Sequence, residues 1–163
     1  MEYRLDKMSP DDEGAVVGIF NYFVENSFAA YPEEKVGREF FQRFVAMVGD
    51  YPAIAVKTDT GDVIGFAFMR PYHRAKTLSR VAEVTYFILP EHTGHGLGSR
   101  VLEYFIEQAK LRGVDNFLAS ISSLNDQSLQ FHRRHGFVEC GRFRDVGVKK
   151  GKSFDVVWMQ RRL

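Results

Sequence analysis

The feature that most constrains the fold is an apolar segment that runs into a glycine-rich turn and then into an amphipathic helix. The apolar segment covers residues 81–89 and ends at Pro90, and the turn covers residues 93–98. The helix that follows carries apolar residues at helical spacing, and Gly113 supplies its C-terminal stop. Glycines at a strand-to-helix junction let backbone N–H groups approach a ligand, and the positive end of the helix dipole adds to their effect. The segment therefore predicts a phosphate-binding or pyrophosphate-binding turn.

Composition indicates one compact domain over residues 1–163. Hydrophobic residues make up 45% of the chain, which is enough for a sizeable core. Lys and Arg number 22 against 21 Asp and Glu, so no strong field attracts nucleic acid or an anionic membrane. Cys140 is the only cysteine, which excludes a disulfide scaffold and CxxC metal sites. The polar first residues differ from a signal peptide and no apolar run spans a bilayer, so we expect a cytoplasmic protein.

Periodicity and turn residues predict the remaining elements. The expected strands cover residues 3–8, 53–57, 63–69, 81–89, 117–122, 137–148 and 154–160. The expected helices are one that begins at residues 9–12, one from about residue 33 to 48, the helix after the glycine turn, and a short one over 125–135. The second helix is expected to turn inward Val36, Phe40, Phe41, Phe44, Val45 and Val48. The order β-α-α-β-β-β-α-β-α-β-β predicts an α/β (α+β) fold, a mixed and mostly antiparallel sheet flanked by helices.

The glycine turn differs from a dinucleotide-binding fingerprint. A Rossmann unit places GxGxxG after the first strand of a βαβ repeat, with an acid about 20 residues further on. Here the pattern is GxGxG after several antiparallel strands, although Asp115 lies at a suitable spacing. An ordinary turn would leave three closely spaced glycines, each costly in chain entropy, without a reason. A phosphate-binding turn of another fold explains them better.

The order of elements and four motifs resemble the GNAT superfamily of acyl-CoA N-acyltransferases, most closely the branch of phosphinothricin and amino-acid N-acetyltransferases. The motifs are the acid-bearing strand 82–90, Asn125 with Ser128 three residues on, the run 131–137, and the terminal segments 141–147 and 155–160. The resemblance covers nearly the whole chain. It implies a homodimeric enzyme that uses no metal and transfers acetyl from acetyl-CoA, by direct attack, to the primary amine of a small molecule. That acceptor would be an amino acid or an analogue of the phosphinothricin or methionine sulfoximine type.

The resemblance also assigns cofactor-binding residues. In this superfamily the strand before the turn diverges from its neighbour and pairs with the pantetheine arm through its backbone, which here means Tyr86, Phe87 and Ile88. A free N–H of Phe87 or Ile88 would polarise the thioester carbonyl. The pyrophosphate would lie against Thr93, Gly94, His95, Gly96, Leu97, Gly98 and Ser99. Asn125 and Ser128 match the position that contacts the arm from the next helix, and Asn125 is an equally good helix N-cap.

The turn departs from the family pattern in its charges. Thr93 stands where an Arg or Gln is usual, and His95 stands where a basic residue is frequent. Backbone donors survive these changes, but fixed positive charge is lost. Because an unperturbed histidine is mostly neutral at neutral pH, we expect cofactor binding to strengthen modestly as the pH falls.

Glu83 and His132 are the predicted catalytic residues. An amine attacks a thioester only after it loses its proton, and the branch has a glutamate at the position of Glu83, so this residue is the predicted base. The alternative is a structural glutamate, with Arg80 as a possible ion-pair partner. His132 occupies the place where many relatives have a tyrosine that protonates the departing thiolate. General acid, cofactor contact and helix packing all stay open for His132.

The acceptor site is the least defined part of the prediction. Residues 26–31 cover the acceptor in this superfamily, and residues 70–74 resemble the Gly-Pro-Phe-Arg region of the branch. This assigns to the acceptor Phe28, Tyr31, Arg70, Tyr72 and Arg74, with the arginines available for an acceptor carboxylate. The alternative is that the arginines form a solvated face. Two other functions stay open: Nα-acetylation of a protein, and non-catalytic sensing of an acyl-CoA.

Overall fold

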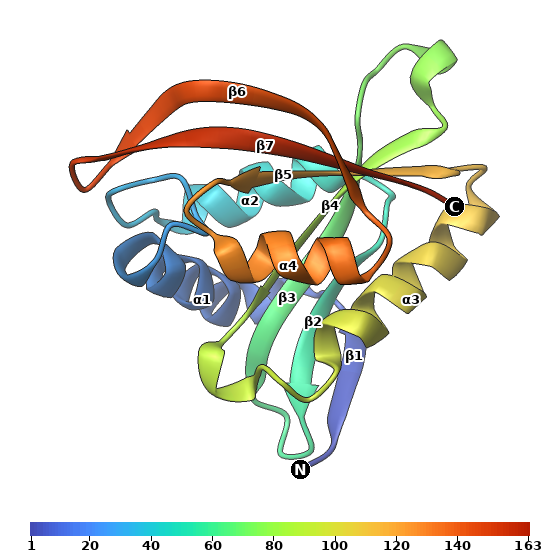
Figure 1. Cartoon of the computed structure of the whole chain (residues 1–163). Coiled ribbons are helices and arrows are strands. Elements are labelled where there is room, and N and C mark those ends of the chain that lie inside the picture. The colour runs from blue at the N-terminus through green and yellow to red at the C-terminus, as the bar shows by residue number, and fades with distance from the viewer.

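The computed structural model describes residues 1–163, and a single seven-stranded sheet runs through it (Figure 1). The strands lie in the order β1-β2-β3-β4-β5-β7-β6, and all neighbours are antiparallel except β4 and β5. Their bounds are β1 Tyr3–Lys7, β2 Ala53–Thr58, β3 Val63–Pro71, β4 Val81–Ile88, β5 Asn116–Ser122, β6 Val138–Lys149 and β7 Lys152–Arg162. The predicted order of elements and the mostly antiparallel sheet are confirmed.

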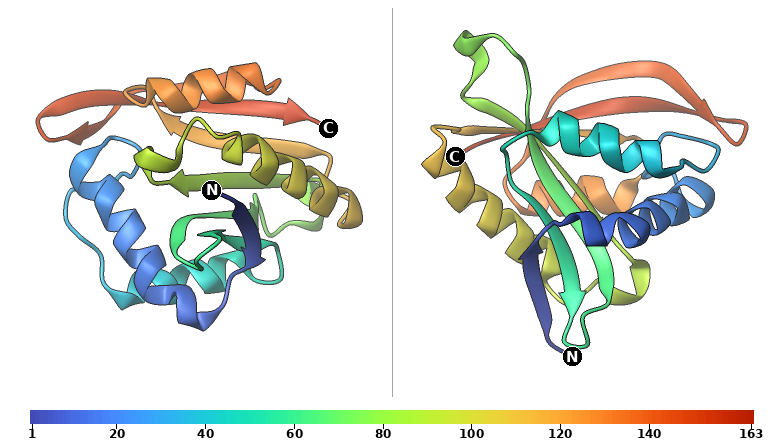
Figure 2. Two further views of the ribbon diagram at one scale, coloured as in Figure 1. Left: turned by 90° about the horizontal axis from the view of Figure 1, so that it is seen from below. Right: turned by 180° about the vertical axis from the view of Figure 1, so that it is seen from behind.

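Four α-helices cover the two faces of the sheet, as Figures 1 and 2 show from several sides. Helices α1 (Glu13–Asn26) and α2 (Arg38–Val48) lie on one face, and α3 (Leu97–Leu111) and α4 (Asp126–Arg134) lie on the other. Single-turn 3₁₀ helices cover Pro10–Asp12 (η1), Lys76–Leu78 (η2) and Pro90–His92 (η3). None of the helices has the length and apolarity that crossing a membrane requires.

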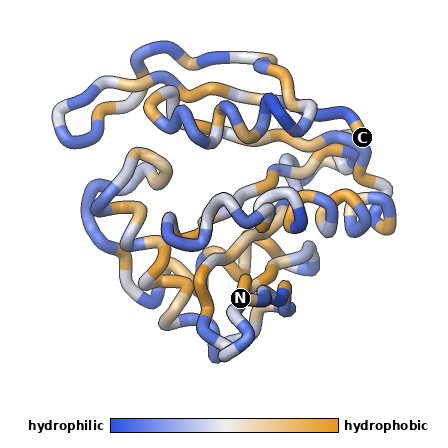
Figure 3. Tube along the Cα trace, turned by 60° about the horizontal axis from the view of Figure 1, so that its bottom comes forward, coloured by the Kyte–Doolittle hydropathy of each residue, from blue (hydrophilic) through white to orange (hydrophobic).

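Each face of the sheet has its own apolar core. The core under α1 and α2 is rich in phenylalanine, and Phe44 packs edge-on against Phe66 and Phe68. The core under α3 includes Phe105 and Phe117, both fully buried. Figure 3 shows the same division along the chain, because apolar segments lie on the central strands and hydrophilic ones at the outer turns. The two cores hold the sheet rigid from both sides.

The second helix differs from its prediction in two ways. It begins at Arg38, not near residue 33, because the Asn21 side chain binds both backbone groups of Val36. Asn21 Oδ1 accepts from Val36 N–H at 2.8 Å and Asn21 Nδ2 donates to Val36 O at 2.9 Å, which satisfies both groups outside a helix. Val45, predicted to face inward, is 47% exposed. Phe41, Phe44 and Val48, which were also predicted to face inward, are buried.

The parallel pair β4–β5 is short, and this positions the site. The two strands are in register only from Val81 to Glu83, opposite Asn116 to Leu118. Beyond Glu83 the strands diverge, while β4 stays paired with β3 as far as Ile88. The edge of β4 that faces β5 is therefore open along its second half. The glycine turn and the N-terminus of α3 follow directly from that open edge.

Candidate active site

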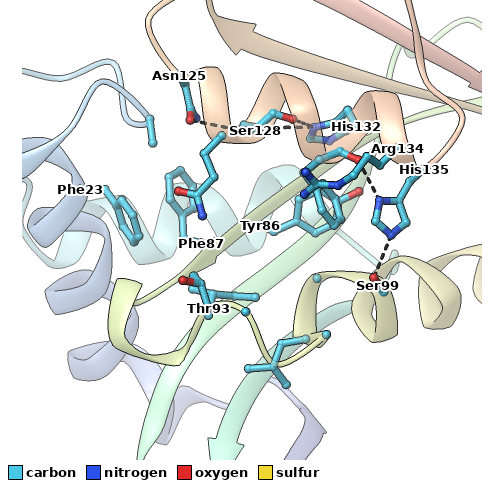
Figure 4. A pocket seen from close by; sticks show the side chains of 18 residues that line it. Phe23, Tyr86, Phe87, Thr93, Ser99, Asn125, Ser128, His132, Arg134 and His135 are labelled. Carbon is cyan, nitrogen blue, oxygen red and sulfur yellow. Dashed lines mark hydrogen bonds between the residues drawn. The ribbon is translucent and has the colours of Figure 1, made fainter.

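A groove of about 390 Å³ opens beside the divergent strands β4 and β5 (Figure 4). All but one of the predicted cofactor residues line it: Tyr86, Phe87, Ile88, Thr93, Gly94, Gly96, Leu97, Gly98, Ser99, Asn125 and Ser128. The exception is His95, whose ring lies 5.9 Å from the ring of Tyr3, outside the groove. The His95 ring therefore lies away from the other predicted cofactor residues, and its pH-dependent contribution stays a prediction.

The backbone of β4 offers its open edge to this groove. Leu89 N–H donates to Ile64 O at 2.9 Å, and Tyr72 N–H donates to Val81 O at 3.2 Å. Because the β3–β4 register between these points is unbroken, odd-numbered residues of β4 bond to β3 and even-numbered ones point the other way. The N–H of Phe87 thus faces β3, whereas the N–H groups of Tyr86 and Ile88 face the open side. The N–H of Phe87 or Ile88 was predicted to donate to the thioester carbonyl, and of these two only the N–H of Ile88 faces the open side.

The glycine turn presents a row of unpaired donors. No backbone N–H from Gly94 to Ser99 has an acceptor in the protein, and the first bond of α3 is Arg100 N–H to Gly96 O at 3.1 Å. Gly96 caps the helix with φ +73°, a left-handed conformation that favours glycine. Gly98 permits close packing, because a Cβ there would lie 2.8 Å from the Phe131 ring. Free N–H groups at a helix N-terminus form a site for an anionic group such as a pyrophosphate.

Helix α4 closes the groove from the opposite side. Asn125 is the N-cap, since its Oδ1 accepts from Ser128 N–H at 3.3 Å, and it also lines the groove, so both predicted roles are compatible. His135 is structural: its Nδ1 donates to Phe131 O at 2.8 Å, so its Nε2 accepts from Ser99 Oγ at 2.8 Å. The hydroxyl of Ser99 is therefore already engaged.

Arg134 is a groove residue that the motif reading missed. It lines the groove from the last turn of α4, is exposed, and takes part in none of the ion pairs of the protein. Figure 4 shows its side chain beside Tyr86 and His135. Arg134 lies seven residues after Gln127 and three after Phe131, both of which line the groove, and this helical spacing was available in the sequence. Arg134 supplies the fixed positive charge that Thr93 and His95 do not.

His132 is a buried residue that lines the groove, and its tautomer is fixed. Its Nδ1 lies 2.7 Å from Ser128 O, and because a carbonyl only accepts, Nδ1 carries the proton and Nε2 has only a lone pair. Nε2 is buried without a partner, as is the hydroxyl of neighbouring Tyr86. Burial lowers the pKa of His132 to about 4. Of the three roles left open for His132, this geometry argues against proton donation, and both cofactor contact and helix packing are compatible with it.

Glu83 stands at the point where β4 and β5 separate. It is 7% exposed, and its Oε2 lies 2.8 Å from Nη2 of Arg70, the residue opposite it on β3. Burial raises the pKa of Glu83, and the charge and hydrogen bond of Arg70 oppose that rise. The proposed alternative partner, Arg80, instead pairs with Asp115 on the protein surface. Glu83 is therefore a buried carboxylate held by one cation.

The predicted acceptor residues fall into two groups. Tyr31 lies close to the fork: its hydroxyl is 3.1 Å from Ser120 Oγ, and the charge of Glu83 adds to the burial that raises the pKa of Tyr31. Phe28 lies on the same connection between α1 and α2, with Lys152 Nζ 5.7 Å from its ring centre. Ser120 is a second residue that the motifs did not indicate.

Tyr72 and Arg74 form the second group and lie apart from Arg70. Both are exposed on the connection between β3 and β4, and their predicted role at the acceptor stays a prediction. Figures 1 and 2 show this connection projecting away from the sheet. Arg70 precedes it, on β3, and only this arginine reaches Glu83.

Comparison with known proteins gives consistent matches along the chain. Residues 16–137 match the model of the acetyltransferase (GNAT) family. An L-methionine sulfoximine/L-methionine sulfone acetyltransferase of Pseudomonas aeruginosa is 30% identical over 155 residues, which is 93% of this chain and 90% of the relative.

Two solved structures share the whole fold. One is a GNAT superfamily phosphinothricin acetyltransferase from Sinorhizobium meliloti in complex with AcCoA, with a TM-score of 0.91 and 27% identity, covering 100% of this chain and 89% of that one. The other is a ribosomal-protein-alanine N-acetyltransferase from Brucella melitensis, with a TM-score of 0.87 and 28% identity, covering 100% of both chains.

Proposed function

Because the chain belongs to the GNAT acetyltransferase family, we propose that it is an acetyl-CoA-dependent N-acetyltransferase whose acceptor is the primary amine of an amino acid or a close analogue. The observation that carries this proposal is the fork at Glu83: a buried carboxylate ends the doubly paired part of β4, and three residues further along the strand Tyr86 begins the segment that lines the groove. The amino-acid analogues in the names of the relatives support the acceptor class.

The groove fits acetyl-CoA at both ends. The open N–H group of Tyr86 is placed to pair with the amide-containing pantetheine arm, as an added strand would. The free N–H groups from Gly94 to Ser99 suit the pyrophosphate, with Arg134 as the nearby cation. The bound co-substrate supplies the acetyl group as an activated thioester.

Glu83 is the proposed base. Free amines are mostly protonated at neutral pH, so a carboxylate that draws off the proton through ordered water increases the reactive fraction. Ile88 N–H is the proposed donor to the carbonyl oxygen on which charge develops. Burial raises the pKa of Glu83, and the charge and hydrogen bond of Arg70 favour its ionised form against that rise. Since a thiol has a pKa of about 8.5, the departing thiolate needs little acid assistance, and the geometry of His132 offers none.

The acceptor lies, in this proposal, between the α1–α2 connection and the fork. Phe28 and Tyr31 provide aromatic walls, and Arg70 retains guanidinium donors for an acceptor carboxylate beyond its contact with Glu83. We also propose a homodimer, because the edge strand β6 exposes an unusual set of apolar side chains, namely Val138, Phe143, Val146 and Val148. A cytoplasmic location remains the expectation from composition.

A second candidate function is acetylation of a protein N-terminus. The likeness in fold to the ribosomal-protein-alanine N-acetyltransferase favours it. Short peptides ending in a free alanine amine therefore belong in the same acceptor panel as free amino acids. Turnover of the peptides with no turnover of free amino acids would establish this second function in place of the first.

The decisive experiment is acetyl-CoA-dependent thiol release with a panel of amino acids, their sulfoximine, sulfone and phosphinic analogues, and short peptides. Glu83→Gln is expected to lower kcat by about 100-fold, a typical loss for a general base, with little change in the Kd of acetyl-CoA. Glu107→Gln, on the outer face of α3, is the matched control. In the wild type, kcat/KM is expected to fall as the pH drops through the raised pKa of Glu83. Wild-type kcat in Glu83→Gln at every pH would exclude the base role, and acetyl-CoA binding without turnover would indicate a sensor.

A further inference from the structure

Lys149, the last residue of β6, is a buried cation with no carboxylate in contact. It is 1% exposed, and its Nζ donates to two backbone carbonyls, Ser27 O at 2.8 Å and Ala30 O at 2.6 Å. Burial and the charge of Lys150 lower the pKa of Lys149, and Glu33 opposes them. A lysine is rarely buried in this way without a task, because desolvating its charge is costly.

Both carbonyls belong to the connection between α1 and α2. This connection has no regular structure from Ser27 to Gly37, so its backbone groups depend on tertiary contacts. Ser27 Oγ also donates to Phe23 O at 2.8 Å and accepts from Ala29 N–H at 3.1 Å, which forms a compact turn after α1. Lys149 holds this turn from the outside through its two carbonyls.

The residues held by Lys149 are those that face the proposed reaction. Ala29 lines the groove together with Phe23 and Phe87. Two residues further on, Tyr31 reaches Ser120 with its hydroxyl and lies within the electrostatic influence of Glu83. The position of this wall depends on the turn that precedes it.

The tip of the β6–β7 hairpin makes further contacts with the same connection. Lys150 N–H donates to Glu33 Oε1 at 2.5 Å, and Lys150 Nζ donates to Glu25 O. Phe154 of β7 stacks on Tyr31, with ring centres 5.8 Å apart and an interplanar angle of 5°. Figures 1 and 2 show the hairpin tip beside the α1–α2 connection. Segments more than a hundred residues apart in the chain thus form one wall.

We propose that Lys149 is a positioning residue for the acceptor: by holding the carbonyls of Ser27 and Ala30, it sets Tyr31 at Ser120 beside Glu83. The proposal rests on the acetyl transfer argued above, since the acceptor wall has meaning only for that reaction. The role is indirect, because Lys149 itself does not line the groove.

The test uses Lys149→Met, which keeps most of the side-chain length and removes the ammonium. We expect the KM of the acceptor to rise about 10- to 100-fold, as for a displaced substrate-positioning group, with the Kd of acetyl-CoA changed less than twofold. Lys110→Met, an exposed lysine in the last turn of α3, is the control and is expected to match the wild type. Lys149→Gln keeps one donor for one carbonyl, so its acceptor KM is expected to rise by a smaller factor.

A second readout does not depend on activity. Trp158 is the only tryptophan, and it lies opposite Ser120 in the β5–β7 register, so it is on the same face as the Tyr31–Ser120 contact. Loss of the Lys149 contacts is expected to increase quenching of Trp158 fluorescence by acrylamide, with no change in Lys110→Met. If the wild type acetylates no amine while this difference appears, the proposed function fails and the positional role of Lys149 stands.

A purely structural role would lower the melting temperature of Lys149→Met but leave acceptor KM and Trp158 quenching as in the wild type, and that result overturns the proposal. If Lys149→Met does not fold, Lys149→Gln decides: an unchanged acceptor KM in that variant also overturns it. A rise in acceptor KM equal to a rise in the Kd of acetyl-CoA would place the effect in the groove as a whole and would equally contradict the assignment.

Discussion

Gly147 on β6 is a position where one added methyl group should disturb the acceptor wall from a distance. It lies directly opposite Phe154 in the β6–β7 register, and a Cβ built on it would overlap Phe154 Cζ and lie 2.5 Å from Cε2 and 2.6 Å from Cε1. Because carbon atoms pack at about 3.5–4.0 Å, the ring must retreat by more than about 1 Å. Phe154 is 8% exposed and stacks on Tyr31, so the ring has little room to move.

The cost of Gly147→Ala follows from these contacts. Overpacking costs about 1–3 kcal/mol, and loss of the aromatic stack adds about 0.5–1.5 kcal/mol. Alanine loses less chain entropy on folding than glycine does, which offsets about 0.5–1 kcal/mol and leaves a net destabilisation of about 2 kcal/mol. For a chain of this length that lowers Tm by about 4–8 °C.

Gly141→Ala is the matched control, since Gly141 lies on the same strand with nothing within 4 Å of an added Cβ. The assay is thermal and urea unfolding of both variants. Gly141→Ala is expected to equal or slightly exceed the stability of the wild type. A double-mutant cycle with Phe154→Leu should show coupling of about 1 kcal/mol or more between positions 147 and 154. Equal losses in Gly147→Ala and Gly141→Ala, or no coupling, would refute the reasoning.

Two further predictions concern the groove. Arg134→Gln should raise the Kd of acetyl-CoA, measured by calorimetry, about 3- to 10-fold at low salt and by less at high salt, because salt screens a surface charge. Arg133 does not line the groove, so Arg133→Gln should change this Kd little. Equal effects of the two substitutions would exclude a specific role of Arg134. His132, with its pKa lowered to about 4, binds protons less readily when folded than when unfolded, so its contribution to stability is present above about pH 6.5 and is lost as the pH falls toward 4. Between pH 6.5 and 4, the free energy of unfolding measured in urea should therefore decrease by up to about 3 kcal/mol more in the wild type than in His132→Asn. The same pH dependence in both proteins would contradict this prediction.

Local signals in the sequence predicted most of the fold because strands, turns and helix ends depend mainly on residues that are neighbours in the chain. Gly113 and Gly136 end their helices with φ of +70° and +83°, and the β6–β7 turn lies where its Lys-Gly pattern indicates. The start of α2 was wrong because a side chain on another helix, Asn21, decides it. Contacts of that kind leave no periodic signal.

The site was predictable to the extent that backbone geometry defines it. The glycine turn and the fork at Glu83 follow from a strand, a turn and a helix in sequence. The partner of Glu83 could not be predicted, because the ten residues between Arg70 and the start of β4 do not form a short hairpin turn from which the β3–β4 register could be counted. Lys149 was equally hidden, since its partners are main-chain carbonyls that any residue type carries.

The fork explains why one strand serves both halves of the proposed reaction. As far as Glu83, β4 is bonded on both sides and Ala82 is buried in the core under α3, so the carboxylate is attached to a rigid segment of backbone. Beyond Glu83 one edge of β4 loses its neighbour, and its polar groups must find water or a ligand. A closed sheet would satisfy those groups and leave no site, whereas an earlier divergence would place Glu83 on a mobile edge. The position of the last β4–β5 residue pair therefore determines that the proposed base, Glu83, is held rigidly next to a strand edge that is open for binding.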